Sequence, residues 1–488
     1  MSDSPKRFLR DVGWSFASIA VSAGIQFLLR VFLARHYHAD DIGLYTIAFT
    51  FYSFGLVLAG FGVETALTKY VAERADPART NLLATSGIGI SFVIGIGFGL
   101  VLYSASPYIA DSFFKMPELV VLLRTVSISF PFIALEKAVL GFLNGTRRMR
   151  LYAAINIVQN VLVIILTVLL AMASLAIEFA VVGLVLPMIA VSMLSLLYIR
   201  RNLMRPSLSA CIPSVKVLLG FGLFVVLANG LGVIQTYLDG LLLGHFASNV
   251  EVGIYGVAST LALAVRLPSS AMAMVTSPMI SAYWGKNETR SIEQLVDQAM
   301  KWSAIYAVSA AFVGYCLGRQ LLTLFFGAEY ASGSLAFQIL VIGGVLGIVQ
   351  SSVGGTLSQT AYVRLIYKFT GVTLALDAGL SVLLIPRLGL AGAALASSAT
   401  LVVYSLVQFY YTQRRVRIRI DWPWFVRLFG VTAFTGTVTY VAAKVFDVYV
   451  TTALGTLVLA AIIVRYFLSE DERRVILGIL HISRKGVR

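Results

Sequence analysis

The chain has 488 residues, of which 58% are hydrophobic and only 12% are charged. A soluble protein carries about 25% charged residues, so this composition excludes a soluble enzyme, a disordered chain and a disulfide-rich scaffold, and leaves a polytopic membrane protein. The net charge of +15 fits that class, because cytoplasmic loops of membrane proteins collect lysine and arginine.

A helix needs about 20 apolar residues to cross a bilayer, and the sequence contains fourteen such stretches. We therefore predict an all-α polytopic membrane protein with fourteen transmembrane helices. In chain order the predicted spans cover residues 13–35, 42–66, 81–104, 119–143, 151–172, 177–199, 217–244, 252–284, 298–318, 335–358, 368–386, 389–412, 424–443 and 448–468.

The basic residues give the predicted topology. Fourteen is an even number, so both termini lie on one side, and 29 of the 38 lysines and arginines fall in segments on that side. Only 5 fall in loops on the opposite side. This bias places both termini in the cytoplasm and predicts a multi-pass protein of the cell membrane.

The connecting loops are short, so no domain outside the membrane is available for soluble catalysis. The two cysteines, Cys211 and Cys316, are far apart, and the four histidines lack metal-ligand spacing. No Gly-rich phosphate-binding loop of an ATPase is found. We expect no metal and no cofactor, with H⁺ or Na⁺ as candidate coupling ions.

The first predicted helix pair resembles the seventh and eighth helices. Residues 25–36 and 234–245 share Ile, Gln, two Leu and His at equivalent positions. Residues 43–50 and 253–260 share Gly, Tyr, Ala and Thr. We interpret these matches as an internal repeat.

A weaker similarity relates residues 143–151 to residues 357–365, in the same order along the chain. The repeat predicts an N-terminal six-helix lobe over residues 1–205 and a C-terminal six-helix lobe over residues 206–412. Residues 413–488 add two helices and a cytoplasmic tail. Two six-helix halves share one orientation, so a pseudo-two-fold axis along the membrane normal and a cavity between the lobes are expected.

Charged residues inside the bilayer cost roughly 2.5–3.5 kcal/mol each on insertion scales, so they tend to be functional or paired. Arg30 and Asp239 occupy equivalent positions of the repeat. Arg30 is a candidate phosphate ligand with Asp239 as its counterion or a cation site, and an inter-lobe salt bridge is the alternative. The predicted spans contain eight charged residues: Arg30, Glu64, Arg124, Glu136, Lys137, Asp239, Arg266 and Asp377.

The other intramembrane residues are divided by charge. Arg266, Arg124 and Lys137 are candidate substrate ligands, since arginine suits phosphate well. Arg124 and Lys137 lie close enough to the ends of their helices to reach lipid headgroups instead. Among the acids, Asp377 is a candidate proton or sodium site, and Glu64 and Glu136 are counterion or coupling candidates. For Glu64 we expect a structural partner in Lys69 or a nearby arginine.

The segment Phe32–Tyr45 resembles the first hairpin of the polysaccharide/oligosaccharide flippase family, which belongs to the superfamily of multidrug, oligosaccharidyl-lipid and polysaccharide exporters. Asp239 followed by Gly253-Ile254-Tyr255 is similar to that family's second half. The run from Ile385 to Ala394 is similar to its Pro-x-x-Gly-x-x-Gly-Ala-Ala link. This resemblance covers roughly the first 410 residues.

The resemblance implies two bundles that work by alternating access on a polyprenyl-(pyro)phosphate-linked glycan, carried to the outer leaflet for assembly of cell-surface polysaccharide or glycoprotein. It implies membrane lipids and glycan-assembly enzymes as partners, and we expect a monomer. A lipid II flippase and a cation-coupled multidrug antiporter are the alternatives within the superfamily. A membrane glycan polymerase or ligase and a structural partner of a synthesis complex are the alternatives outside it.

The segment from Arg414 to Trp424 alternates basic and apolar residues between two predicted spans. Tryptophan and arginine favour the membrane interface and anionic lipid. We therefore interpret this segment as facing the membrane surface, and no nucleic-acid partner is expected.

Overall fold

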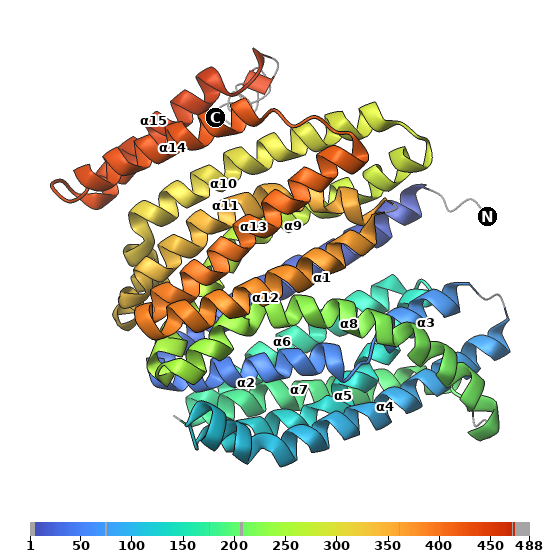
Figure 1. Ribbon diagram of the computed structural model, residues 1–488. Coiled ribbons are helices and arrows are strands. Elements are labelled where there is room, and N and C mark those ends of the chain that lie inside the picture. The colour runs from blue at the N-terminus through green and yellow to red at the C-terminus, as the bar shows by residue number, and fades with distance from the viewer. Residues whose placement is uncertain are drawn as a thin grey trace, which may run out of the picture. The chain divides into compact units, whose positions relative to one another are not determined.

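The computed structural model describes residues 5–73, 76–174, 176–204, 208–360, 362–470 and 472–473. Within these ranges the chain consists of helices, turns and short links, with no β-strand (Figure 1). The elements are α1 (Pro5–His36), α2 (Ala39–Leu58), α3 (Val63–Ala72), α4 (Pro77–Pro107), η1 (Tyr108–Phe114), α5 (Leu119–Gly145), α6 (Met149–Ala173), α7 (Ile177–Ile199), η2 (Arg200–Asn202), α8 (Leu208–Phe246), α9 (Asn249–Gly285), α10 (Thr289–Phe326), η3 (Ala328–Gly333), α11 (Ser334–Ser358), α12 (Val363–Leu388), α13 (Leu390–Val416), α14 (Trp422–Ala442) and α15 (Val448–Tyr466).

The fourteen predicted spans all coincide with helices. Thirteen helical segments of the described chain are long and apolar enough to cross a membrane, with α2 and α3 together forming one of them. The remaining predicted span lies in α1, which is 32 residues long. Several helices run past the predicted apolar limits, as α10 does with a first turn that contains Arg290. The prediction of an all-α polytopic fold is confirmed.

The second span was predicted over residues 42–66, and its helix is interrupted toward the C-terminal end of that range. The helix breaks after Leu58, where Phe61 and Gly62 have φ angles of 43° and 68°. A left-handed backbone is tolerated best by glycine. Gly62 also lies against α8, so that a Cβ atom added to it would overlap the carbonyl oxygen of Gly222.

Gly62→Ala is expected to destabilise the protein by about 1–3 kcal/mol, because it combines a strained φ with overlap of a neighbouring backbone. Gly60→Ala is the matched control, since the nearest atom to its added Cβ is Lys137 Cβ at 3.5 Å. The measurement is thermal unfolding of the purified protein in detergent. Equal melting temperatures for the two variants would refute the packing argument.

Backbone contacts divide the chain into two compact units. Unit 1 comprises Met1–Thr260, Phe325–Ser332 and Thr370–Ala396, and unit 2 comprises Leu261–Leu324, Gly333–Phe369 and Ser397–Arg488. Unit 1 combines segments from both predicted halves, whereas unit 2 contains only segments of the predicted second half and the residues after it. The six-helix lobes predicted from the repeat, with boundaries at 205 and 412, stay a prediction.

In unit 1, α4 and α5 pack closely, and α5 also packs against α7 (Figure 1). Small residues permit the approach, since a Cβ atom added to Gly95 would lie 2.7 Å from Pro131 Cα, and one added to Gly99 would lie 2.8 Å from Ser127 O. Close packing at small residues is the usual way in which transmembrane helices associate. The buried core around them extends over α3, α4, α5, α7 and the start of α8.

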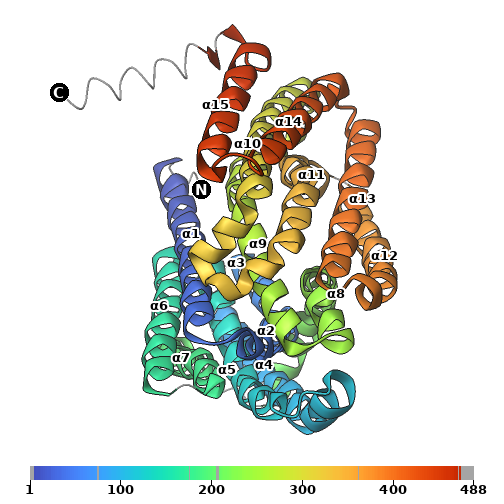
Figure 2. The ribbon, with the colours of Figure 1, turned by 90° about the vertical axis from the view of Figure 1, so that its left-hand side faces the viewer.

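In unit 2, a separate hydrophobic core joins α10, α11, α13, α14 and α15. Figure 2 shows α14 and α15 beside α10. Phe312 of α10 lies 3.6 Å from a Cβ atom added to Gly436 and 2.9 Å from one added to Gly455. The two C-terminal helices are therefore packed onto the rest of this unit rather than attached only through the chain.

Candidate functional site

Arg30 of α1 and Asp239 of α8 make corresponding contacts in the two copies of the repeat. The guanidinium of Arg30 lies over the ring of Tyr45 on α2, 5.5 Å from its centroid. The hydroxyl of Tyr255 on α9 donates to Asp239 Oδ2 at 3.5 Å. Tyr45 and Tyr255 are the tyrosines of the two Gly-x-Tyr motifs. The repeat thus places a charge against a tyrosine in each half, with opposite sign.

The second pair of similar segments, residues 143–151 and 357–365, also shares a hydrogen bond. Thr146 Oγ1 donates to Leu143 O at 3.2 Å, and the corresponding Thr360 Oγ1 donates to Leu357 O at 3.4 Å. The weaker similarity seen in the sequence therefore corresponds to the same local turn in both copies.

Arg30 is buried, with 9% of its surface exposed. Its Nη2 donates to the hydroxyl of Thr46 on α2, and its Nε is buried without a hydrogen-bond partner. In the described chain no carboxylate lies within ion-pair distance of Arg30. Burial of an unpaired charge is unfavourable, so this guanidinium has donor capacity for an anionic group.

Two glycines bring α2 and α9 together at their N-terminal ends. A Cβ atom added to Gly43 would overlap the carbonyl oxygen of Asn249, and one added to Gly253 would overlap that of Ala39. Asn249 and Ala39 lie four residues before Gly253 and Gly43 respectively. The contact is therefore reciprocal between the two Gly-x-Tyr motifs.

One turn further along, the same two helices enclose the arginine. A Cβ atom added to Gly256 of α9 would lie 2.6 Å from Arg30 Nη2 and 2.8 Å from Thr46 Oγ1. The close approach of α2 and α9 and the burial of Arg30 are therefore parts of one arrangement.

Asp239 also connects α8 to α12. Ser381 Oγ donates to Asp239 Oδ1 at 3.0 Å, and both residues are buried. Asp377, which is 2% exposed, precedes Ser381 by four residues and so lies on the same face of α12. Gln235, one turn before Asp239 on α8, donates from Nε2 to the Oγ1 atom of Thr373 at 3.4 Å. Thr373 lies one turn before Asp377 on α12.

Two of the predicted residues, Glu64 of α3 and Lys137 of α5, meet in the structure. Lys137 Nζ lies 3.4 Å from Glu64 Oε2, so the prediction that Lys69 or a nearby arginine is the partner of Glu64 is wrong. Lys69 instead lies over the rings of Tyr70 and Phe221, at 5.1 and 4.6 Å. The turn of α3 directs Lys69 to these aromatic rings.

Glu136 is 3% exposed, and its Oε2 is buried without a hydrogen-bond partner in the described chain. Its neighbour Lys137 is engaged with Glu64. Adjacent residues on a helix point about 100° apart, which accounts for their different surroundings.

Glu64→Gln and Lys137→Gln are each expected to lower the melting temperature, because each removes one charge and leaves its partner uncompensated. The double variant is expected to lose less than the sum of the two, with a coupling of about 1 kcal/mol. A double-mutant cycle of thermal unfolding measures this coupling. Strict additivity would show that the observed pair contributes nothing to stability.

The remaining two candidates lie in different surroundings. Arg124 of α5 is exposed and lies 5.0 Å from the centroid of the Tyr103 ring. Arg266 of α9 is half-buried, and its guanidinium has no hydrogen bond or ion pair with any residue that the structure describes. Arg266 belongs to unit 2, whereas the other seven candidates belong to unit 1.

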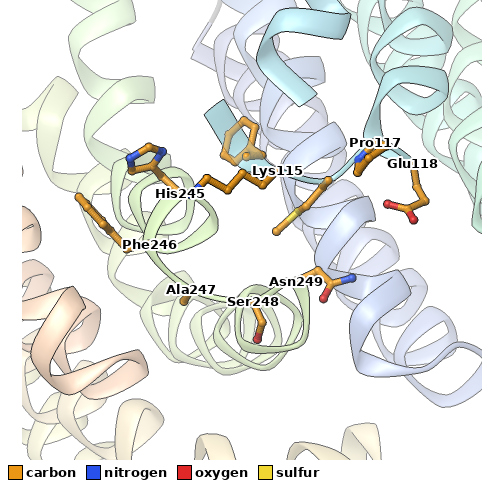
Figure 3. A pocket seen from close by; sticks show the side chains of 10 residues that line it. Lys115, Pro117, Glu118, His245, Phe246, Ala247, Ser248 and Asn249 are labelled. Atoms are coloured by element: carbon orange, nitrogen blue, oxygen red, sulfur yellow. The ribbon is translucent and has the colours of Figure 1, made fainter. Parts of the chain in front are cut away.

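A polar hollow of about 390 Å³ borders the glycine contact. It lies between the loop after η1 and the turn from α8 to α9, and Figure 3 shows Lys115, Glu118, His245 and Asn249 around it. His245 Nδ1 is hydrogen-bonded to Phe113 O at 2.7 Å. Asn249 contributes both to this hollow and to the contact with Gly43.

Sequence reasoning missed Thr46, Ser381, Gly43 and Gly253 as parts of these arrangements. The Gly-x-Tyr motifs were recognised as part of the internal repeat and of the family resemblance, but not as a contact between two helices. Their position at matching places in a repeat was the available signal, since repeat-related glycines near a pseudo-two-fold axis can contact each other directly.

Two family models match the chain. The one described as "Polysaccharide biosynthesis protein" covers residues 8–284, and the one described as "MatE" covers residues 225–383. Among curated proteins, the chain is 23% identical over 411 residues to the "Probable low-salt glycan biosynthesis flippase Agl15" of Haloferax volcanii. That match covers 83% of this chain and 84% of the relative.

Solved structures of transporters share the fold. "Lipid II flippase MurJ, inward closed conformation" has a TM-score of 0.74 at 15% identity, covering 93% of this chain and 99% of that chain. A "multidrug resistance MATE family transporter of the MOP superfamily" has a TM-score of 0.70 at 15% identity, covering 81% and 94%. These relatives are named as transporters and flippases. Since the first family model matches more than half of its length, the chain belongs to the polysaccharide biosynthesis protein family.

Proposed function

We propose that the protein is a flippase that moves a polyprenyl-(pyro)phosphate-linked oligosaccharide from the cytoplasmic to the outer leaflet by alternating access. The translocated oligosaccharide would serve assembly of cell-surface polysaccharide or glycoprotein. The observation that carries this proposal is Arg30, a buried guanidinium with an unused Nε donor and no described carboxylate within ion-pair distance. Arginine presents a planar set of donors that matches phosphate oxygens.

Arg266 of unit 2, whose guanidinium also lacks a described partner, stays a proposed ligand in its own right. Arg124 and Lys137 are weaker ligands in this scheme, because Arg124 lies over Tyr103 and Lys137 pairs with Glu64. The protein would act in the cell membrane with both termini in the cytoplasm, as a monomer alongside the enzymes that assemble the glycan.

Coupling to an ion is proposed at Asp239, Ser381 and Asp377. Two carboxylates and a hydroxyl on facing turns of α8 and α12 provide oxygen atoms for Na⁺ or a carboxyl for H⁺. Glu136 is a second candidate for carrying a proton, because its Oε2 is buried without a described partner.

The names of the relatives support the glycan cargo, since Agl15 and a second Haloferax volcanii protein, the "Probable flippase AglR", are both called flippases. A lipid II flippase is the closest alternative in chemistry, because its cargo also bears a pyrophosphate. The MurJ-like fold favours neither cargo. A cation-coupled multidrug antiporter is disfavoured by a buried arginine without a carboxylate partner, since cationic drugs are repelled by such a site.

The test uses the purified chain in proteoliposomes with a labelled polyprenyl-pyrophosphate oligosaccharide in one leaflet. Accessibility of the glycan to an added lectin measures its arrival in the other leaflet. We expect faster arrival than in protein-free vesicles and no movement of a cationic dye. Dye movement without glycan movement would establish the antiporter instead, and movement of lipid II alone would establish the lipid II flippase.

Asp239→Asn is expected to make translocation insensitive to an imposed proton or sodium gradient, because an amide neither takes up a proton nor neutralises Na⁺. Ser381→Ala, which removes one donor to Asp239, is expected to weaken that sensitivity less. Asp111→Asn, an exposed carboxylate on η1, is the control and should respond like the wild type. The measurement is the rate at which the glycan becomes accessible to lectin, at two sizes of the imposed gradient. A rate in Asp239→Asn that depends on the gradient as in the wild type would remove Asp239 from the coupling scheme.

A further inference from the structure

The link between α13 and α14 holds exposed arginines on a backbone that is anchored in the core. Val416, Ile418 and Ile420 are 2%, 2% and 9% exposed and belong to the core of unit 2. Arg417 and Arg419, which alternate with them, are exposed. Burial of these apolar residues thus leaves the arginines between and after them exposed.

The backbone of this link is strained and fixed. Arg417 has a φ angle of 60° just after the end of α13, a position that usually takes glycine. Strain of this kind persists only where surrounding contacts enforce it. Here Arg419 N donates to Glu293 Oε1 at 2.9 Å, and Asp421 Oδ1 accepts from Trp424 N at 3.3 Å. The link is therefore a preformed surface rather than a loose loop.

The charge on this surface is uncompensated. The two nearby acids, Glu293 and Asp421, accept hydrogen bonds from backbone amides, and none of the arginines here forms an ion pair with a described residue. Two of them rest against rings, with Arg414 Nη1 donating to Tyr410 Oη at 2.6 Å and Arg415 lying 5.9 Å from the Tyr362 centroid. The arginines of this surface are Arg414, Arg415, Arg417, Arg419 and Arg427.

The position of the link relates it to a membrane surface. The apolar helices α13 and α14 are joined by only the five residues after Val416, so the link cannot extend far from the bilayer. Trp422 and Trp424 follow it and are partly exposed. Tryptophan and arginine together are typical of the headgroup layer.

We propose that the α13–α14 link is a docking site for anionic phospholipids of the bilayer, whose phosphate groups bind the exposed arginines. It is separate from the cargo site, because it uses arginines of unit 2 that no part of the cargo proposal requires. An anionic bilayer lipid is the proposed occupant, since the α13–α14 link is exposed and basic, joins two apolar helices and precedes two tryptophans. The inference does not rest on the proposed function.

The test measures which lipids surround Trp422 and Trp424 in the full chain. The reporter protein carries phenylalanine at the other three tryptophans, Trp14, Trp284 and Trp302. It is reconstituted with phosphatidylcholine and phosphatidylglycerol, and in parallel samples one or the other lipid carries brominated acyl chains that quench tryptophan. We expect roughly fivefold or greater enrichment of phosphatidylglycerol at the tryptophans, since each basic residue near an anionic surface contributes about 1 kcal/mol.

Three variants of the reporter separate the causes. The change Arg415→Gln, Arg417→Gln and Arg419→Gln should abolish the enrichment. Lysine at the same three positions should restore most of it, which shows that the loss comes from charge and not from misfolding. The matched control removes three exposed arginines from the α5–α6 turn and should keep the enrichment: Arg147→Gln, Arg148→Gln and Arg150→Gln.

The proposal is overturned by equal quenching from both lipids in the unmodified reporter. It is equally overturned if the first variant keeps the enrichment, if the lysine variant fails to restore it, or if the α5–α6 control loses it to the same extent. If the triple arginine-to-glutamine variant keeps the lipid preference but loses glycan translocation, the α13–α14 link would be assigned to the cargo instead.

Discussion

Alanine at Gly43 or Gly253 is expected to slow translocation by about tenfold or more. Each added Cβ would overlap a backbone carbonyl oxygen of the other helix, and a backbone cannot move aside as a flexible side chain can. Overpacking of this kind costs about 1–3 kcal/mol. The cost falls only on states in which α2 and α9 touch, so it shifts the population away from those states.

Spin labels at Asp40 and Val250, which are exposed residues beside the contact, report the distance between the two helix ends. Gly43→Ala and Gly253→Ala should both shift the distance distribution to longer values. Gly240→Ala is the control, because its added Cβ meets no described atom within 4 Å. Unchanged distances in both contact variants would show that the glycines do not control the approach of α2 and α9.

The glycine contact also determines the surroundings of Arg30. Gly256 and Thr46 lie one turn beyond the two glycines and enclose the guanidinium. Separation of α2 from α9 would therefore change the burial of the proposed phosphate ligand. Whether α2 and α9 touch at Gly43 and Gly253 therefore affects whether Arg30, one turn further along, is accessible to an anion.

Arg30→Gln is expected to reduce translocation by at least about tenfold, because hydrogen bonds to charged groups contribute about 1.5–3 kcal/mol. Arg30→Lys should be intermediate, since lysine retains the charge but lacks the planar set of donors. Arg124→Gln is the contrasting variant. Its side chain is exposed over Tyr103, so its loss should change the rate much less.

The lectin-accessibility assay in proteoliposomes measures these rates, with protein amount in the vesicles matched between variants. Equal losses in Arg30→Gln and Arg124→Gln would point to a general effect of positive charge. In that case the assignment of the cargo phosphate to Arg30 would be wrong.

The fold was predictable because membrane insertion imposes strong rules on sequence. Each span must be apolar over its full width, and one miscounted helix would have inverted every later loop and removed the bias in basic residues. The break at Phe61 and Gly62 escaped prediction, since a turn buried between helices needs no polar residues. Hydropathy alone therefore gave the number of helices but not their interruptions.

The repeat singled out Arg30 and Asp239 as equivalent positions. Their contacts with Tyr45 and Tyr255 were not predicted and come from the structure. The partner of Glu64 was not predictable in the same way, because a contact between α3 and α5 depends on how the helices pack. Asp239 and Ser381, which are 142 residues apart in the sequence, illustrate the same difficulty.

The most direct measurement of the central claim is the affinity of the purified protein for a polyprenyl pyrophosphate that carries no sugar. We expect the wild type to bind this lipid and to bind the phosphate-free polyprenol much more weakly. We expect Arg30→Gln to raise the Kd for the polyprenyl pyrophosphate by at least about tenfold. The same Kd for wild type and Arg30→Gln would contradict the claim that Arg30 holds the phosphate of the cargo.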